Sequence, residues 1–294
     1  MLEPDALNRE KLQFWREGYV LVRGMFTSEE MALVKAKVAQ IDAMNARVEH
    51  LRARQAEGSH PSFETIFVWN DVEGEDLFAR VGRSYKLLDR LSHYYDDDVY
   101  DYHNKISLKY PGIVGFRPHQ DYAYWRDYGC PFPEAHTAFI SIDRATQANG
   151  CLRVVPRSHL LGTLEHGSWS ARGSDHGVQP ERMQALLDAG YSFTPIETAP
   201  GDVVLFHGNT IHGSEDNNSD QPRLAMIATM NTRRNSPDPR LNKPGHPYWS
   251  RQQRVHDPIT SADLERPLPD FELRYPGGPE FDTTTHDQRV HAHG

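Results

Sequence analysis

The sequence predicts a mainly β domain flanked by helices, and three observations support this fold class. The chain has 294 residues, which suits one large unit. Its first third shows helical hydrophobic periodicity, whereas short β-rich runs separated by turn residues follow Asp98. No internal repeat and no GxGxxG, Walker, GxSxG or HExxH motif is present. The spacing of the β-rich runs and the missing motifs favour an all-β sandwich or barrel over alternating β-α-β units.

The elements of the first third follow from periodicity and capping. A strand is indicated where a β-branched and aromatic run lies between Gly18 and Gly24. Thr27 and Glu30 form a capping box that begins a long amphipathic helix, which we expect to reach roughly Gln55. The other elements expected in this third are a helix over residues 4–16, a strand over 62–69 and a helix over 76–95.

The β-rich part is expected to form the core of the domain. The predicted strands cover residues 99–110, 137–142, 151–155, 191–197, 203–206 and 224–231. Residues 166–180, rich in Gly, Ser and His, are expected to be a mobile loop or lid at the barrel mouth. We therefore predict one domain over residues 1–294, with mostly helical support in 1–98, a β core in 99–232 and an irregular Pro-rich C-terminal segment in 233–294.

Charge and composition exclude several classes of partner. The formal net charge of −9, with 32 basic and 41 acidic residues, argues against a nucleic-acid binder. Cys130 and Cys151 are the two cysteines and lack CxxC spacing, so we expect a reducing cytoplasm and no thiolate-bound zinc. No apolar run approaches the ~18 residues of a membrane span, and no signal peptide is apparent. We expect a cytoplasmic protein without membrane contact; its oligomeric state cannot be predicted.

His119 and Asp121 are the first candidate metal ligands. On an extended strand their side chains project from the same face, so both can reach one ion. The composition of the chain gives about two His-x-acid triplets by chance, so the pair alone equally suits an ordinary ion pair. The case rests on a second motif further along the chain.

That second motif ends in His212 and Ser214 and is followed by Arg223. Two imidazoles and one carboxylate, with three coordination positions left open, suit non-haem Fe(II) rather than zinc. The open positions allow a bidentate 2-oxo acid and dioxygen to bind the same ion. The planar guanidinium of Arg223 suits the far carboxylate of 2-oxoglutarate, and Ser214 adds a hydroxyl donor.

Four ordered motifs carry a family resemblance. They are His119-Gln-Asp121, Asn149-Gly-Cys-Leu-Arg-Val-Val-Pro-Arg-Ser-His159, Gly201-Asp-Val-Val-Leu-Phe-His207, and His212-Gly-Ser214 with Arg223. Over roughly residues 19–231 the chain resembles the phytanoyl-CoA dioxygenase (PhyH) family of Fe(II)/2-oxoglutarate-dependent oxygenases, in particular its ectoine-hydroxylase-like bacterial members. The resemblance implies a double-stranded β-helix (jelly-roll, cupin-like) barrel, iron on His119, Asp121 and His212, and 2-oxoglutarate on Arg223 and Ser214.

The resemblance also implies a reaction. We expect hydroxylation of an unactivated C–H bond in a small metabolite, such as an amino acid, a compatible solute or a natural-product intermediate, with O2 consumed and succinate and CO2 released. Asp121 separates this chain from halogenating relatives, which lack the carboxylate. The alternatives are a desaturating or ring-forming oxygenase of the same family and a non-catalytic metal-binding barrel. A zinc hydrolase ranks last, because no acid/base motif accompanies the ligands.

Two strands supply the candidate substrate and cosubstrate residues. On the strand 102–110, Lys105 and Ser107 share a polar face; turned into the barrel, that face lies near the ligands and implies an anionic partner. Facing outward, its lysines would simply be solvated, which is the commoner fate of lysine. Thr137, on the next predicted strand, is expected to reach 2-oxoglutarate.

The aromatic residues after Asp121 are further substrate candidates. If the strand continues, Ala123 and Trp125 lie on the iron side by parity, and we expect Trp125 to form a wall of the substrate pocket. Tyr122 is a second candidate. The alternative is that these aromatic side chains fill the barrel or surround its surface.

Overall fold

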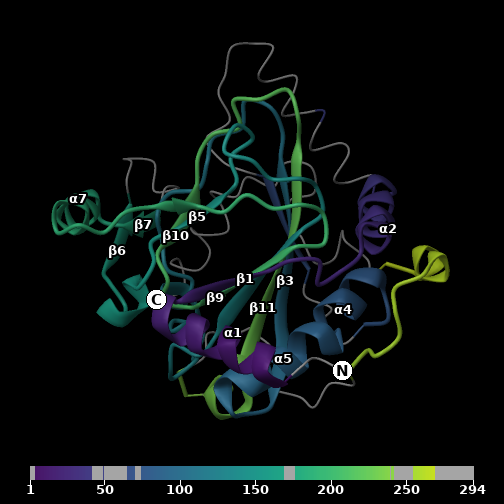
Figure 1. The fold of residues 1–294 in the computed structure, drawn as a ribbon, viewed down its shortest axis with the longest axis horizontal. Helices are drawn as coiled ribbons and strands as arrows, with labels where there is room; N and C mark the ends of the chain where they lie inside the picture. Colours follow the sequence, from purple (N-terminus) through teal and green to yellow (C-terminus); the bar gives the residue numbers. More distant parts are fainter. Residues whose placement is uncertain are drawn as a thin grey trace.

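The computed structural model places a large and a small antiparallel sheet face to face, with helices on the outer side of the large one (Figure 1). It describes residues 4–41, 49, 65–69, 74–168, 176–238, 240–241 and 254–268. Within these residues the large sheet has six strands, in the order β1-β9-β4-β11-β3-β2. The small sheet has three, in the order β10-β5-β8, and β6 pairs with β7 in a separate hairpin.

The strands of the large sheet confirm most of the predicted β runs. Each is rich in the β-branched and aromatic residues that suit a pleated, buried surface. Their bounds are β1 (Tyr19–Val22), β2 (Thr65–Trp69), β3 (Val99–Lys109), β4 (His136–Ser141), β9 (Val203–His207) and β11 (Arg223–Thr232).

The small sheet and the hairpin differ more from the prediction. The expected strand over 191–197 contributes only β8 (Thr194–Pro195), whereas β5 (Leu152–Val154) forms as expected and β10 (His212–Ser214) was not predicted. Both ends of the segment expected to be a mobile loop are paired with each other, as β6 (His166–Ser168) and β7 (His176–Val178). The prediction of a loop throughout 166–180 is therefore wrong at its ends, and residues 169–175 lie outside the described part.

Six helices and three short 3₁₀ turns are described besides the strands. The capping box at Thr27 is confirmed, since its hydroxyl accepts from the Glu30 amide and the Glu30 carboxylate accepts from the Thr27 amide. The α-helices are α1 (Pro4–Glu17), α2 (Ser28–Ala39), α4 (Leu77–Gly82), α5 (Tyr85–Tyr95), α6 (Tyr122–Trp125) and α7 (Pro180–Asp188). The 3₁₀ turns are η1 (Ser158–Leu161), η2 (Arg233–Asn235) and η3 (Ser261–Glu265).

Two predicted helices have different bounds. The helix α2 ends at Ala39 rather than near 55, because the amides of Gln40 and Ile41 bond to carbonyls three residues back and tighten the last turn. The helix expected over 76–95 divides at Ser84, whose hydroxyl caps α5 and whose backbone forms a β-bridge with Val255. Neither the end of α2 at Ala39 nor the division at Ser84 is visible in the periodicity of the hydrophobic residues.

The C-terminal segment is less irregular than predicted in the part that is described. The 3₁₀ turn η3 carries its own capping box between Thr260 and Asp263. The ammonium group of Lys37 donates to the backbone carbonyls of Leu264 and Arg266 and so fastens this turn to α2. Residues 242–253 and 269–294 lie outside the described part.

The two faces of the large sheet bury different kinds of side chain. The outer face packs Ile106, Leu108 and Met226 against apolar residues of the helices, including Leu87 and Leu91 of α5. In Figure 1, α1 and α5 lie along this sheet. The inner face meets the small sheet through an apolar cluster to which both sheets contribute: Phe139, Leu152, Val154, Ile196, Val204, Phe206 and Ala225. Strand alternation therefore turns the polar residues of β3 inward.

A bulge in β3 shapes the interior further. Along β11, Thr229 pairs with His103 but Met230 pairs with Asp101, so Tyr102 is an extra residue. The bulge reverses the alternation, and Tyr102 packs with Trp125 in one buried cluster.

No helix in the described residues is long and apolar enough to cross a membrane.

Candidate metal centre

His119, Asp121 and His212 converge between the two sheets. The backbones of His119 and His212 form an antiparallel bridge with N···O distances of 2.9 and 3.0 Å. One ligand atom from each of the three side chains lies within 4.8 Å of the others. Asp121 Oδ1 is 3.6 Å from His119 Nε2 and 3.7 Å from His212 Nε2. Two ligand-bearing segments, 91 residues apart in sequence at Asp121 and His212, therefore meet at one point.

The local path of the chain at Asp121 is not the predicted strand. Asp121 has helical dihedral angles, φ −60° and ψ −36°, and stands at the start of α6. The parity argument for Ala123 and Trp125 is therefore wrong, because the extended conformation ends before them. Asp121 still reaches the imidazoles, since the chain turns directly after His119.

Backbone carbonyls fix the tautomers of both histidines. His119 Nδ1 lies 2.8 Å from the Arg117 carbonyl oxygen, and His212 Nδ1 lies 2.9 Å from that of Thr210. A carbonyl only accepts, so each Nδ1 carries the proton and each Nε2 keeps its lone pair. Burial, aided by neighbouring His119, lowers the pKa of His212 to about 4, so this imidazole is neutral at pH 7. A neutral imidazole of this kind suits a divalent transition metal.

The two carboxylate oxygens of Asp121 have different partners. Oδ2 accepts a 2.5 Å hydrogen bond from the Thr137 hydroxyl, which leaves Oδ1 toward the imidazoles. Burial alone would raise the pKa of Asp121, but His212, His119 and Lys105 together hold it well below its usual value. An ionised carboxylate beside two imidazoles fits the 2-His-1-carboxylate donor set.

Gln120, which sequence reasoning missed, joins the segments that carry the ligands. Its amide nitrogen donates to the carbonyls of Gly162 and Asn209 at 2.9 and 2.7 Å, and its side-chain oxygen accepts from the Leu164 amide at 2.7 Å. Its backbone N–H donates to His166 Nε2 at 2.9 Å. The side chain is fully buried. The signal in the sequence was its position between two ligands. A side-chain amide there has two N–H donors and an oxygen with two lone pairs, with which it can hold neighbouring segments in place.

Two buried cations lie beside the metal ligands. Arg223 and Lys109 are cross-strand partners, and both are almost wholly buried. Arg223 donates to the Gly150 carbonyl and the Ser107 hydroxyl, each at 3.0 Å. Lys109 donates to the Ser214 hydroxyl at 2.8 Å. The structure therefore brings two of the three predicted cosubstrate residues, Arg223 and Ser214, together with Lys109, which shares the inward face of β3 but was not singled out as a ligand.

Burial penalises the charged forms of both side chains, although the charge of Asp216 opposes this effect at Lys109. It lowers the pKa of Lys109 to about 7 and that of Arg223 to about 9. Gly150, with φ +72°, lets its backbone approach, because a Cβ there would lie 2.7 Å from Lys109 Nζ and 2.4 Å from the Glu215 carbonyl oxygen. This contact explains the glycine in the Asn149-Gly-Cys motif.

The predicted substrate residues are only partly brought to the metal centre. Lys105 Nζ lies 5.3 Å from the ring centroid of Trp125. Burial lowers the pKa of Lys105, opposed by the nearby charge of Asp121. Ser107 instead contacts Arg223. The Tyr122 hydroxyl donates to the Cys130 carbonyl at 3.1 Å, so it is held within its own buried cluster.

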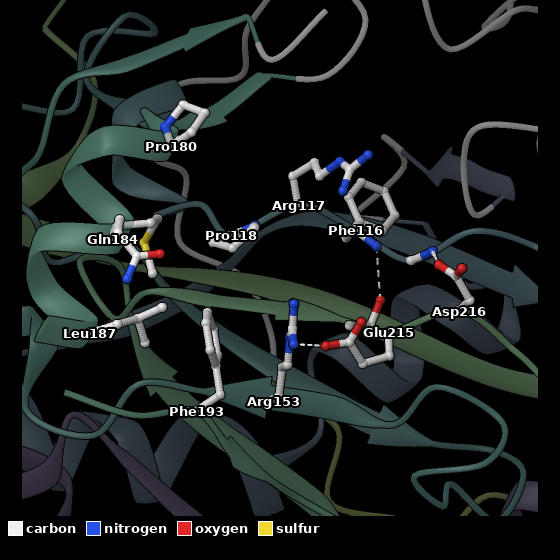
Figure 2. Close-up of a pocket in the computed structure, with 13 residues that line it drawn as sticks. Phe116, Arg117, Pro118, Arg153, Pro180, Gln184, Leu187, Phe193, Glu215 and Asp216 are labelled. Atoms are coloured by element: carbon white, nitrogen blue, oxygen red, sulfur yellow. Dashed lines mark hydrogen bonds and ion pairs between the residues drawn. The ribbon is translucent and has the colours of Figure 1, made fainter. Parts of the chain in front are cut away.

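A pocket of about 440 Å³ lies beside the metal centre but is a different space (Figure 2). Arg153 occupies its middle, with its guanidinium 4.2 Å from the ring centroid of Phe193 and paired with Glu215. Its neighbours Leu152 and Val154 pack between the sheets, so Arg153 lies on the opposite face of β5. None of the three ligand residues lines this pocket.

The sequence of this chain matches a known family and several known proteins. The family model described as phytanoyl-CoA dioxygenase (PhyH) matches residues 14–225. The ectoine dioxygenase of Bordetella parapertussis is 29% identical over 247 residues, which cover 80% of this chain and 79% of that protein. The 2-aminoethylphosphonate dioxygenase of an uncultured bacterium (HF130_AEPn_1) is 37% identical over 127 residues, 43% of this chain and 44% of that protein.

Solved structures share the fold. EctD from S. alaskensis with bound Fe superposes with a TM-score of 0.62 at 22% identity, covering 87% of this chain and 91% of that one. The epimerase SnoN from nogalamycin biosynthesis gives 0.58 at 20% identity, covering 89% and 98%. The chain therefore belongs to the phytanoyl-CoA dioxygenase (PhyH) family of iron(II)- and 2-oxoglutarate-dependent oxygenases.

Proposed function

We propose that this dioxygenase hydroxylates an unactivated C–H bond of a small metabolite, consuming O2 and 2-oxoglutarate and producing succinate and CO2. One observation carries the proposal: three ligand atoms converge on one point beside a buried pair of cations. The donor set leaves coordination positions open for a 2-oxo acid and dioxygen, and the cations suit the far carboxylate of that acid.

The iron ligands in this proposal are His119 Nε2, Asp121 Oδ1 and His212 Nε2. Carbonyls on both Nδ1 atoms and the Thr137 hydroxyl on Asp121 Oδ2 hold each ligand in the orientation that coordination needs. When bound, the iron supplies the oxidising chemistry of the reaction. The protein supplies the binding site, its orientation and the exclusion of water.

The cosubstrate residues are Arg223, Ser214 and Lys109. Two N–H groups of Arg223 are oriented by Gly150 and Ser107, and Lys109 is oriented by Ser214, so little side-chain freedom is lost when a carboxylate binds. Contact between Thr137 and 2-oxoglutarate stays a prediction; its hydroxyl is engaged with Asp121.

We further propose that the two facing sheets form a double-stranded β-helix and that the chain is a single domain, as predicted. The all-antiparallel pairing and the shared inner core support this arrangement. The partner in this proposal is a small molecule rather than nucleic acid or membrane, and the location is the cytoplasm. The names of the relatives, with ectoine, 2-aminoethylphosphonate and L-proline as substrates, support a small polar metabolite.

The proposal is tested by cosubstrate loading and turnover. Anaerobic addition of Fe(II) and 2-oxoglutarate should give a visible charge-transfer absorbance band, and admitting O2 should give succinate even without substrate. Asp121→Ala and His212→Ala should lose both signals. The matched controls are Asp188, which is exposed, and His93, which is partly exposed; their alanine variants should keep both signals.

The same experiment separates the alternatives. A band without any succinate above background supports a non-catalytic metal-binding barrel instead. An unchanged band in both ligand variants contradicts the metal site. Once a substrate is found, a product lacking the added oxygen atom supports a desaturating or ring-forming oxygenase.

A further inference from the structure

The pocket on the outer face of the small sheet is a space that the iron site does not use (Figure 2). Its volume of about 440 Å³ falls within the range of roughly 300–1,000 Å³ in which proteins bind small organic molecules. The helix α7 and two segments outside the helices and strands give it an apolar wall of Phe116, Pro118, Pro180, Met183, Leu187 and Phe193. Such a wall suits the hydrocarbon part of a ligand.

Arg153 places a positive charge in the middle of this pocket. It pairs across the small sheet with Gly213, and its side chain lies on the face of β5 opposite to Leu152 and Val154. Its guanidinium lies 4.2 Å from the ring centroid of Phe193. The side chain is only 22% exposed, so the pocket walls shelter the charge from solvent.

The guanidinium of Arg153 has a donor edge that no acceptor fills. Its Nη1 pairs with the carboxylate of Glu215, whereas its Nε is buried and has no hydrogen-bond partner in the described part of the chain. The planar fork of a guanidinium matches the two oxygens of one carboxylate along the edge formed by Nε and Nη2. A buried donor without a partner is rare in native proteins and indicates a missing acceptor. A carboxylate supplies that acceptor.

The other charged groups of the pocket also favour an anion. Burial lowers the pKa of Arg153, and the charge of Arg117 lowers it further, while Asp216 opposes the effect. Asp216 Oδ1 already accepts from the Gly115 amide at 2.9 Å. Glu215 is 61% exposed, so its carboxylate can turn into solvent. An entering carboxylate therefore competes for Arg153 only with a largely solvated partner.

We propose that this pocket is a second ligand site, which binds a small molecule with one carboxylate and a short aliphatic or aryl body. The carboxylate pairs with Arg153, and the hydrocarbon body lies against the apolar wall. None of the iron ligands His119, Asp121 and His212 lines the pocket, and Ser214 belongs to the wall that it shares with the interior. This assignment goes beyond the proposed function and does not depend on it.

The test titrates carboxylates into the full chain loaded anaerobically with Fe(II) and saturating 2-oxoglutarate, so that the cosubstrate fills its own carboxylate site. Calorimetry measures the affinities for hexanoate, butanoate and the neutral hexanamide. We expect hexanoate to bind at least roughly tenfold more tightly than hexanamide, since charge-assisted hydrogen bonds to Arg153 are worth about one decade or more in affinity. It should also bind roughly tenfold more tightly than butanoate, because each further buried CH₂ adds roughly fourfold.

Two variants with opposite expected effects assign the binding to this pocket. Arg153→Met removes the charge and should lower the affinity for hexanoate to that for hexanamide. Glu215→Gln removes the competing carboxylate and should raise the affinity several-fold, a gain that a folding defect does not produce. Arg182→Met, at an exposed arginine of α7 that does not line the pocket, is the matched control and should bind as the parent protein does.

The visible band of the iron and 2-oxoglutarate complex reports on the interior in the same samples. No binding of hexanoate to the parent protein, or equal binding of hexanoate and hexanamide, overturns the proposal. An affinity that is unchanged in Arg153→Met, or that Glu215→Gln does not raise, also overturns it. Bleaching of the band by hexanoate shows that the probe displaces the cosubstrate, which places its site in the interior and not in this pocket. Absence of the band in the parent protein contradicts the proposed function instead, and the variants still decide whether hexanoate binds in this pocket.

Discussion

The hydroxyl of Thr137 fixes which carboxylate oxygen of Asp121 faces the two imidazoles. Because it donates to Oδ2, it keeps Oδ1 directed at the two imidazoles. In Thr137→Val the carboxylate loses this restraint, and we expect the affinity for Fe(II) to fall roughly 10- to 100-fold. Equilibrium titration of Fe(II) under argon measures the change. Thr137→Ser keeps a hydroxyl and should remain within a few-fold of the parent; equal loss in both variants would contradict this role.

Lys109 makes cosubstrate affinity depend on pH. Burial lowers its pKa to about 7, so the cationic fraction falls as the pH rises from about 6 to 8. The affinity for the 2-oxoglutarate dianion should therefore fall above pH 7, by at most tenfold per unit. Titrations at several pH values check this. Lys109→Met should bind more weakly at pH 6.5 and lose the dependence; the same slope in the variant would argue against Lys109 as its source.

At the scale of elements, Gln120 couples the β6–β7 hairpin to the metal ligands. In Gln120→Leu the carbonyls of Gly162 and Asn209 and the Leu164 amide lose their partners, at about 1–3 kcal/mol each. Amide hydrogen exchange of residues 160–168 should then rise roughly tenfold or more, while the strands β3 and β11 stay protected.

The control for this prediction is Gln184→Leu. Gln184 is exposed on α7 and donates to Asp188. Its loss should leave the exchange of residues 160–168 unchanged. Faster exchange spread evenly over all elements in Gln120→Leu would point to global destabilisation rather than to a local coupling.

The same elements show what sequence reasoning reaches. The two long strands, β3 and β11, were predicted within one or two residues because their pattern is local. The strands β10 and β6 have three residues each and include glycine, so their pairing with β5 and β7 rather than their own sequence makes them strands. The turn at Asp121 was missed for a similar reason, since its geometry depends on contacts with Gly208 and Thr137.

The site residues show the same difference between what a local pattern reveals and what long-range contacts determine. His119, Asp121, His212 and Arg223 were found because their types and order carry the chemistry. Lys109 and Gln120 act through burial and through partners far away in sequence, which no local pattern shows. The bulge that turns Tyr102 toward Trp125 likewise depends on the register with β11.

At the scale of the whole molecule, ligand binding should stabilise the fold. The ligands come from β10 and from the distant segment that leads into α6, so a metal that binds only the folded chain shifts the unfolding equilibrium. Mn(II), which favours similar ligands, at about 100 times its dissociation constant should add about 2.7 kcal/mol, or several degrees in Tm, and 2-oxoglutarate should add further stability on top of it. Thermal unfolding followed by circular dichroism measures this. Asp121→Ala should show almost no shift, and a shift equal to that of the parent would place the metal elsewhere.

The central claim is that the two distant ligand segments share one ferrous ion. A crystal structure of the protein soaked anaerobically with Fe(II) and 2-oxoglutarate tests it most directly. We expect a single ion within about 2.0–2.2 Å of His119 Nε2, Asp121 Oδ1 and His212 Nε2, with a carboxylate of 2-oxoglutarate on Arg223. An ion bound elsewhere, or one that any of these three side chains does not contact, would contradict the account.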